Sequence, residues 1–251
     1  MTDSMEKYSI IIPYRDRETH LKILLPVLLE RFKDKDFEII VSEQNDDNNF
    51  QIACVENVGF KHATGNIIIL HQVDYVPTDN VSYKIDSEPI LPAKVGNFVT
   101  DSLKPRDYFD IPAGYRKFGE EIDPAFYGGV IVLKREHFEK INGLNPLYKG
   151  WGNEDEDLRE RLKWAGFKPI RNTEGTFICL YHTDNGDMNN KPLEKQNDFI
   201  EGRKLYSKAF EYKDIGYSNM SWDEEVFIPE GMDKVKWVKS TNFKVDGKSL
   251  G

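Results

Sequence analysis

Short apolar runs separated by segments of helical periodicity mark the first part of the chain. Three runs, at residues 9–13 (SIIIP), 37–41 (FEIIV) and 67–70 (IIIL), have the length and the branched side chains of buried strands. Helical segments are expected between them, and an alternation of strands and helices is typical of an α/β sheet. The pattern therefore predicts an α/β fold whose first strands are covered by helices.

Two helices are expected between these runs. The first has its large apolar residues at helical spacing, at Leu21, Leu24, Leu25, Leu28 and Phe32. Asp16 is expected to be the N-cap of this helix, and Pro26 is expected to kink it. Residues 57–64 predict a shorter helix that Gly65 closes.

The second half of the chain continues this alternation. Residues 130–133 (VIVL) predict a strand that leads into a helix over residues 135–142. Residues 176–181 (TFICLY) predict a further strand of the same sheet, followed by a polar loop over residues 183–198. Residues 78–125 lack periodicity and are expected to form long surface loops, which often carry function in compact domains.

Charge and composition exclude several classes of protein. The 34 Lys and Arg residues against 43 Asp and Glu residues give a formal net charge of −9, so a broad electrostatic hold on nucleic acid or on an anionic membrane is not expected. No apolar run approaches the roughly 18 residues of a transmembrane helix. Cys54 and Cys179 are too few for a disulfide framework. We therefore expect a single folded domain in the cytoplasm, with no transmembrane segment.

A carboxylate follows the third predicted strand. Asp74 lies just past residues 67–70, and ligands of open α/β sheets bind at the carboxyl ends of strands. The alternative is that Asp74 only opens a turn before Pro77, and spacing does not decide between the two. His182 follows the strand predicted at residues 176–181, but a lone histidine is more often a structural residue than a metal ligand.

The densest chemistry lies in the segment GWGNEDED, residues 150–157. Trp151 stands between two glycines, as an aromatic side chain able to move over a ligand would. Four consecutive acids follow, and a helix N-terminus accounts for one or two of them through the helix dipole. Because like charges so close together raise at least one pKa, the crowding favours a general base or a metal- and hydroxyl-binding group.

Several stretches together resemble the β-1,4-galactosyltransferase family, in particular its C-terminal galactosyltransferase module. They are IIPYRDRETHLKILLPVL (11–28), NVGF (57–60), VDYVP (73–77), YGGVIVLKREHFEKINGLNPLYKGWGNEDEDLRERL (127–162) and the strand before His182. The long stretch is specific, because Tyr-Gly-Gly, Asn-Gly-Leu and Gly-Trp-Gly-x-Glu-Asp follow one another in order. Residues 215–251 have no counterpart in this resemblance.

The resemblance implies a GT-A type α/β fold, with a Rossmann-like nucleotide-binding sheet of mixed strands in a single domain. Residues 1–214 would form this domain, with a nucleotide-binding half at about 1–77 and an acceptor and catalytic half at about 126–214. Residues 215–251 would be a C-terminal extension. The implied activity is inverting transfer of a hexose or N-acetylhexosamine from a UDP-sugar to a glycan hydroxyl, with Mn²⁺ as cofactor, in polysaccharide biosynthesis.

The family's motifs also imply roles for single residues. Those on the donor side are Pro13, Tyr14, Arg15, Arg17, Gln72, Val73, Asp74, Gly129 and Trp151. Those on the acceptor side are Tyr127, Trp151, Asp155 and Glu156. The implied general base is Asp155, with Glu154 beside it. The implied metal ligands are Asp74 and His182, with Cys179 as a third candidate where the family has a methionine.

Two departures from the family's motifs leave other functions open. Gln72 stands where the family has the first acid of its metal motif, and Ile52 stands where it has an arginine. A catalytically inactive relative that binds a glycan or nucleotide sugar is the first alternative, and a metal-dependent hydrolase is the second. Asp74, Glu154, Asp155 and His182 together favour an active transferase, since a diphosphate leaves readily only when its growing charge is neutralised.

Overall fold

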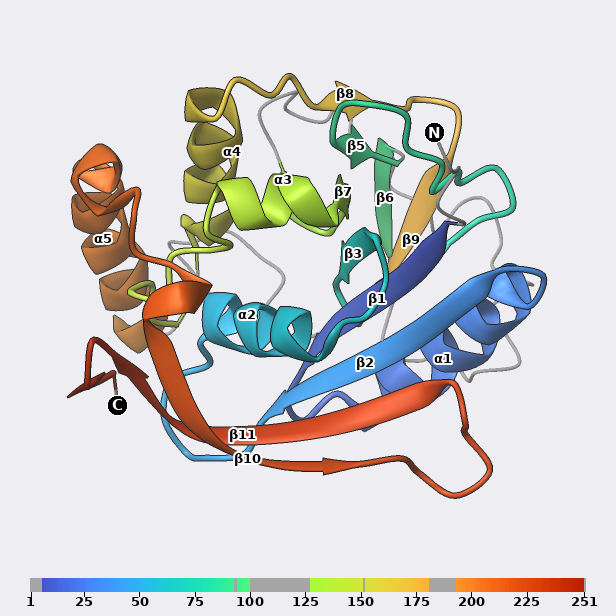
Figure 1. Ribbon diagram of the computed structural model, residues 1–251, viewed down its shortest axis with the longest axis horizontal. Helices are drawn as coiled ribbons and strands as arrows, with labels where there is room; N and C mark the ends of the chain where they lie inside the picture. The colour runs from blue at the N-terminus through green and yellow to red at the C-terminus, as the bar shows by residue number, and fades with distance from the viewer. Residues whose placement is uncertain (1–5, 93, 100–126, 151, 181–192, 251) are drawn as a thin grey trace.

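A mixed β-sheet forms the centre of the computed structural model, which describes residues 6–92, 94–99, 127–150, 152–180 and 193–250 (Figure 1). Within these residues the sheet has nine strands, in the order β10 (Met220–Phe227), β11 (Val235–Val245), β2 (Asp36–Gln44), β1 (Lys7–Tyr14), β3 (Ile67–His71), β7 (Val130–Lys134), β5 (Ile90–Leu91) and β8 (Ile170–Arg171), with β12 (Lys248–Ser249) paired to β11. Strands β11, β2, β1 and β3 are parallel, and β7 runs antiparallel to β3. The predicted α/β class with mixed strands is confirmed.

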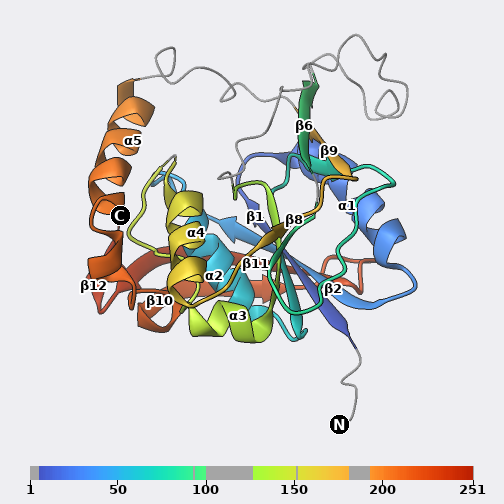
Figure 2. The same cartoon turned by 90° about the horizontal axis from the view of Figure 1, so that it is seen from above.

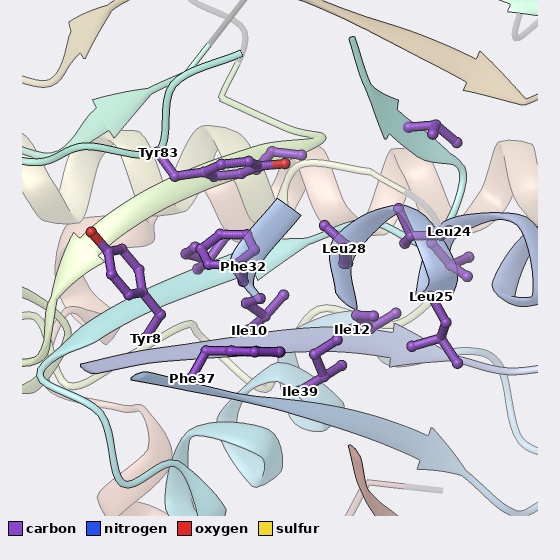
Figure 3. Packing of buried hydrophobic residues seen from close by; sticks show 14 of the residues in the cluster. Tyr8, Ile10, Ile12, Leu24, Leu25, Leu28, Phe32, Phe37, Ile39 and Tyr83 are labelled. Carbon is purple, nitrogen blue, oxygen red and sulfur yellow. The ribbon is translucent and has the colours of Figure 1, made fainter. Parts of the chain in front are cut away.

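Helices cover both faces of this sheet. On one face, α1 (Glu18–Phe32) packs its leucines and Phe32 against Ile10 and Ile12 of β1, as Figure 3 shows. On the other face, Ile11 packs with α2 (Ile52–His62), α3 (Arg135–Lys140) and α4 (Glu154–Trp164). Successive side chains of a strand point to opposite faces, so one apolar run supplies both cores.

The start of α1 differs from its prediction. Asp16 has a positive φ of 52° and lies before the helix, while Arg17 occupies the N-cap position without a side-chain cap hydrogen bond. Asp16 is therefore not the N-cap. The helix continues through Pro26 to Phe32, with its buried face intact.

Helix α2 begins at Ile52, five residues before its predicted start at residue 57. The prediction was too short because the helix is buried on nearly all sides. Every residue from Ala53 to Phe60 is buried, so the polar face that would mark an amphipathic helix is missing. Close packing against the sheet adds to this burial: a Cβ atom on Gly59 would lie 2.4 Å from Cγ2 of Ile11.

A second, smaller sheet corrects the prediction for residues 176–181. Strand β9 (Thr176–Leu180) lies between β4 (Tyr75–Pro77), to which it is antiparallel, and β6 (Lys94–Val99), to which it is parallel. It is therefore not a strand of the main sheet. Strands β4, β5 and β6 also lie within the range 78–125 or at its edge, where only loops were predicted, and residues 100–126 fall outside the described part.

The C-terminal segment is part of the main sheet. Strand β11 runs parallel to β2 along residues 39–44, and β10 forms the outer edge. The indole Nε1 of Trp237 donates a hydrogen bond to Glu43 at 2.6 Å, and its ring meets that of Tyr14 edge-on at 5.3 Å between centroids. Residue 214 therefore does not separate two independent folding units.

Helix α5 (Leu193–Tyr206) lies beside α4, as Figure 2 shows. The hydroxyl of Tyr206 accepts a hydrogen bond from Arg159, and Arg203 forms an ion pair with Glu156. The helix begins inside the predicted loop 183–198, of which residues 183–192 are not described. None of the helices in the described ranges is long and apolar enough to cross a membrane.

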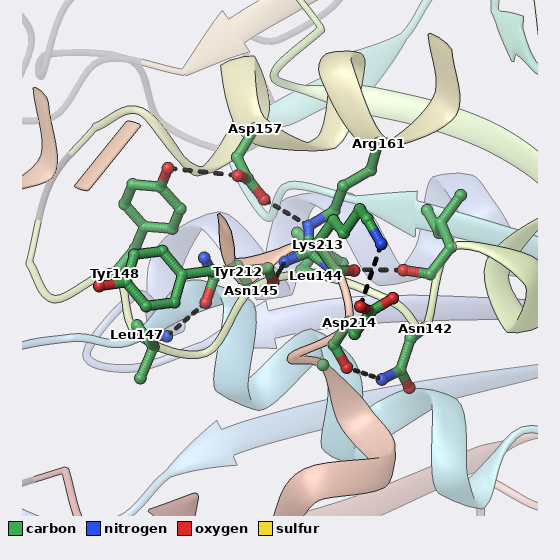
Figure 4. A network of polar contacts seen from close by, with 12 residues as sticks. Asn142, Leu144, Asn145, Leu147, Tyr148, Asp157, Arg161, Tyr212, Lys213 and Asp214 are labelled. Atoms are coloured by element: carbon green, nitrogen blue, oxygen red, sulfur yellow. Dashed lines mark hydrogen bonds and ion pairs between the residues drawn. The ribbon is translucent and has the colours of Figure 1, made fainter. Parts of the chain in front are cut away.

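A buried ion pair fixes α4 to its neighbours (Figure 4). Arg161 donates to the Asp157 carboxylate at 2.5 Å, and both side chains are almost fully buried. The other carboxylate oxygen of Asp157 accepts from the hydroxyl of Tyr148 at 3.3 Å. The Arg161 guanidinium also donates to the carbonyl oxygens of Ile141, Tyr212 and Lys213.

We expect Arg161→Met to lower the free energy of unfolding by about 3 kcal/mol or more, because it leaves the Asp157 carboxylate buried without its cation. Chemical denaturation measures this loss. Lys163→Met is the matched control, since Lys163 forms only an exposed ion pair with Glu160, and it should cost less than about 1 kcal/mol. Equal losses in the two variants would contradict the role given to the buried pair.

Candidate active site

A pocket opens where β3 ends and β7 begins. These two strands are antiparallel neighbours, so Gln72 and Gly129 meet at one edge of the sheet, and the backbone N–H of Gln72 donates to the Gly129 carbonyl at 2.9 Å. The centres of water-sized molecules have a volume of about 30 Å³ available to them in this space, which is open to solvent. Its lining comes from the end of β3, residues 127–131, the loop after α3, and the first turns of α2 and α4: Ile52, Glu56, Leu70, Gln72, Tyr127, Gly128, Gly129, Val130, Ile131, Leu144, Glu154, Asp155 and Leu158.

Five residues predicted from the sequence meet in this pocket: Gln72, Tyr127, Gly129, Glu154 and Asp155. Gly129 is required by its surroundings. Its φ is +90°, and a Cβ atom there would lie 2.5 Å from the ring of Tyr75. Gln72, predicted for the donor side, and Asp155, predicted for the acceptor side, thus line the same pocket. They lie about 80 positions apart in the chain.

The four acids at the start of α4 have different surroundings. Asp157 is held by Arg161, and Glu156 forms an ion pair with Arg203 at 3.0 Å. Glu154 and Asp155 face the pocket. Backbone N–H groups of Glu156, at 2.9 Å, and of Gly128 donate to the Asp155 carboxylate, which fixes its orientation.

Burial and mutual repulsion raise the pKa values of the pocket carboxyls. Burial is the main cause for Glu154, whose pKa rises to about 8, and the neighbouring Asp155 adds to it. The pKa of Asp155 is also raised, by burial and then by Glu156, while its backbone hydrogen bonds act in the opposite direction. A carboxyl whose pKa lies closer to neutrality is better matched to general acid–base chemistry.

The sequence analysis missed a third pocket carboxyl, Glu56 of α2. Its exposed fraction is 4%, and burial, then Glu154 and Asp155, raise its pKa well above the ordinary value. The signal was present in the sequence as a single acid inside the apolar segment ACVENVGF (53–60). It was not recognised, because the helix was expected to start only at residue 57.

Asp74 lies between β3 and β4, next to the end of β9. Its carbonyl oxygen accepts a hydrogen bond from the backbone N–H of Leu180 at 2.7 Å. The strand end that precedes His182 thus lies beside Asp74. The small sheet brings the two together, and not the main sheet to which residues 176–181 were predicted to belong. His182 itself lies outside the described residues, as does Trp151.

Cys179 is a poor metal ligand in this setting. Burial raises the pKa of its thiol, and so does the nearby Asp74, which disfavours the thiolate that binds metals. It is hydrogen-bonded to the side chain of Tyr75, its partner across β4 and β9. Among the described residues, no three His, Cys, Asp or Glu side chains are grouped to hold an ion. Asp74 has the hard oxygen ligands that Mn²⁺ favours.

The remaining donor-side residues lie at the end of β1 and outside the pocket lining. Pro13 and Tyr14 are buried in β1, and Val73 is buried beside Gln72. Arg15 donates to the carbonyl oxygen of Asn48, and its guanidinium lies 5.1 Å from the centre of the Phe50 ring. Arg17 occupies the N-cap position of α1. All of them lie at the carboxyl edge of the parallel strands, where α/β sheets bind ligands.

Two family profiles match this chain. "N-terminal region of glycosyl transferase group 7" matches residues 2–85, and "N-terminal domain of galactosyltransferase" matches residues 113–183. Together they contain every residue assigned to the site from the sequence. Residues 184–251 lie outside both.

Named proteins are similar to most of the chain. β-1,4-Galactosyltransferase 6 of Mus musculus is 28% identical over 88% of this chain and 54% of its own length. A β-N-acetyl-D-glucosaminide β-1,4-N-acetylglucosaminyl-transferase of Lymnaea stagnalis is 32% identical over 74% and 36%. β-1,4-Galactosyltransferase 7 of Drosophila melanogaster is 30% identical over 79% and 62%. The chain spans about half the length of most of the curated relatives it matches.

Solved structures have the same fold. The catalytic domain of Drosophila β-1,4-galactosyltransferase 7, in complex with xylobiose, superposes with a TM-score of 0.66 at 25% identity and covers 94% of each chain. A variant of the same protein, in complex with manganese, UDP-Gal and xylobiose, gives 0.68 at 23% identity. The GT-A type fold is thereby confirmed.

We expect Glu154→Gln to stabilise the protein increasingly as the pH rises. The folded state holds the pKa of Glu154 at about 8, above its ordinary value of 4.5, so its ionisation opposes folding once the pH exceeds 4.5 and fully above 8. The melting temperature of the variant should match that of the wild type near pH 4.5 and exceed it at pH 8.5. Glu160→Gln, on the same helix but outside the pocket, is the matched control. A pH-independent difference for Glu154→Gln would contradict the burial of this charge.

Proposed function

Because the chain belongs to the β-1,4-galactosyltransferase family, we propose that it is an inverting, metal-dependent glycosyltransferase that moves a hexose or N-acetylhexosamine from a UDP-sugar to a glycan hydroxyl. The observation that carries the proposal is the pocket in which Asp155 faces Gln72 and Gly129. The names of the relatives include both galactosyl and N-acetylglucosaminyl transfer, so the donor sugar is proposed only as a class.

Asp155 is the proposed general base. As the acceptor hydroxyl oxygen bonds to the anomeric carbon, the bond from that carbon to the diphosphate breaks, and the hydroxyl proton passes to the Asp155 carboxylate. The nucleoside diphosphate leaves with the electrons of the broken bond. The N–H groups of Glu156 and Gly128 keep the carboxylate in one orientation, which supports such a role.

Glu154 is proposed to act beside the base, and Tyr127, Trp151 and Glu156 complete the acceptor side. Tyr127 lines the same pocket and offers a ring and a hydroxyl to a sugar. Trp151 and Glu156 are proposed as further acceptor contacts on the family resemblance. Pro13, Tyr14, Arg15 and Arg17 are proposed to meet the nucleotide, where two guanidinium groups in an otherwise acidic protein suit a diphosphate.

Asp74 and His182 are the proposed ligands of Mn²⁺. When bound, the ion would act as a Lewis acid for the charge that develops on the leaving diphosphate. Asp74 supplies a hard carboxylate, and the end of β9 that leads to His182 is hydrogen-bonded to it. Cys179 is not included, because its thiol is buried and hydrogen-bonded to Tyr75, and because Mn²⁺ favours hard oxygen ligands over sulfur. The cytoplasmic location and the role in polysaccharide biosynthesis stay predictions from the sequence.

We expect Asp155→Asn to lower kcat by roughly 100-fold or more, since a general base typically contributes a factor of 10² to 10⁴. Donor affinity should stay close to wild type and the melting temperature should not fall, because the amide has the same shape and removes a buried charge. Steady-state kinetics with UDP-sugars and glycan acceptors measure the effect. Wild-type turnover with an unchanged pH profile would exclude Asp155 as the base. Tight donor binding by a wild-type protein that transfers no sugar would favour the inactive relative.

The metal prediction separates Asp74 from Cys179. We expect transfer activity to be lost in excess chelator and restored by Mn²⁺. At the Mn²⁺ concentrations that support wild-type activity, Asp74→Ala should lower the transfer rate at least 100-fold. Cys179→Ser should keep most of it. The comparison uses transfer rates across a manganese titration. Full activity in chelator, or loss only in the Cys179 variant, would contradict the proposed ligand set.

A further inference from the structure

Glu56 is a buried carboxyl that the proposed mechanism does not use. It belongs to α2, is 4% exposed, and lines the pocket together with Gln72, Glu154 and Asp155. An acid at this position has a cost, because α2 here packs among apolar side chains and a buried carboxyl without sufficient partners destabilises the fold. A leucine or isoleucine would fill the same space without that cost.

The hydrogen bonding of Glu56 leaves capacity for a ligand. Within the described residues, its side-chain hydrogen bond comes from Nε2 of Gln72, at the long distance of 3.4 Å. One carboxyl offers more than one such bond. Burial and the carboxyls of Glu154 and Asp155 raise the pKa of Glu56, which favours a neutral group that both donates and accepts.

A hydroxyl group has the matching chemistry, since it also both donates and accepts hydrogen bonds. We propose that Glu56, held by Gln72, is a specificity-determining residue that binds a hydroxyl of the nucleotide sugar in the pocket. The assignment rests on the proposed function. It deepens that function by naming a donor contact on α2 that the sequence motifs do not contain.

The positions of Glu56 and Gln72 favour a contact with the donor over a contact with the acceptor. Gln72 follows β3 directly and precedes by two residues Asp74, the proposed ligand of the ion on the diphosphate. Through Gln72, Glu56 is linked to the strand end that carries Asp74, whereas Asp155 stands at the start of α4. The ribose and the transferred sugar both carry hydroxyls of this kind, and the experiment distinguishes them.

Glu56→Leu removes the hydrogen bonds, and Glu56→Gln keeps a neutral group of similar shape that donates and accepts. Titration calorimetry with Mn²⁺ measures the affinity of each variant for UDP, UDP-galactose and UDP-N-acetylglucosamine. We expect Glu56→Leu to weaken UDP-sugar binding by roughly 10-fold, the effect of one lost hydrogen bond and one unpaired partner. Glu56→Gln should stay within about 3-fold of wild type. If Glu56 contacts the ribose, Glu56→Leu should weaken the binding of UDP to the same extent. If it contacts the transferred sugar, the affinity for UDP should not change.

The controls separate binding from folding. Without ligand, Glu56→Leu should melt at or above the wild-type temperature, since it removes a buried acid beside two others. Glu160→Leu, which removes an acid of α4 outside the pocket, should leave all affinities unchanged. Wild-type affinity in Glu56→Leu would overturn the inference alone, as would a loss in Glu56→Gln equal to that in Glu56→Leu. A wild-type protein that binds none of the nucleotides would overturn the proposed function as well.

Discussion

The buried ion pair between Asp157 and Arg161 holds α4 against its neighbours, and the site depends on the position of that helix. The pair ties the first turn of α4 to the loop after α3 and to the 3₁₀ turn at Ala209–Tyr212. Two residues before Asp157, Asp155 is then presented to the end of β3 and to residues 127–129. One buried acid thus acts as an anchor so that its neighbours can face a pocket.

The same arrangement places three carboxyls in one pocket, which lowers the stability of the fold. Glu56, Glu154 and Asp155 all have raised pKa values, because burial and their neighbours disfavour ionisation. Folding alone does not require such a cluster, and apolar side chains would fill the pocket more favourably. Strongly shifted carboxyls in a cleft are typical of functional sites, which is the physical reason to assign the chemistry here.

The sequence predicted the elements whose patterns are local. The buried strands β1, β2, β3 and β7 and the amphipathic α1 were predicted within a few residues of their observed bounds. The motif Tyr127-Gly128-Gly129 and two of the four acids of α4, Glu154 and Asp155, line one pocket. Helix α2 was predicted too short, since burial on all sides removes the periodicity that identifies a helix, and Glu56 was missed for the same reason.

Features that depend on pairing between distant segments were beyond the sequence pattern. An apolar strand such as β9 gives no indication of which sheet it joins, and it pairs with β4 and β6 instead of the main sheet. Likewise β11 lies beside β2, about 200 positions away, and Trp237 contacts Tyr14 of the nucleotide motif. The C-terminal strands therefore pack against Tyr14, a residue of the proposed donor side.

We propose that the pocket where β3 ends and β7 begins binds a nucleotide sugar with its reacting carbon near Asp155. A crystal structure of the complex with Mn²⁺, a UDP-sugar and a glycan acceptor tests it most directly. The account predicts the ion on Asp74, the sugar against Gln72 and Gly129, and the acceptor hydroxyl within hydrogen-bond distance of Asp155. A nucleotide sugar bound away from this pocket, or an acceptor hydroxyl facing another residue, would contradict it.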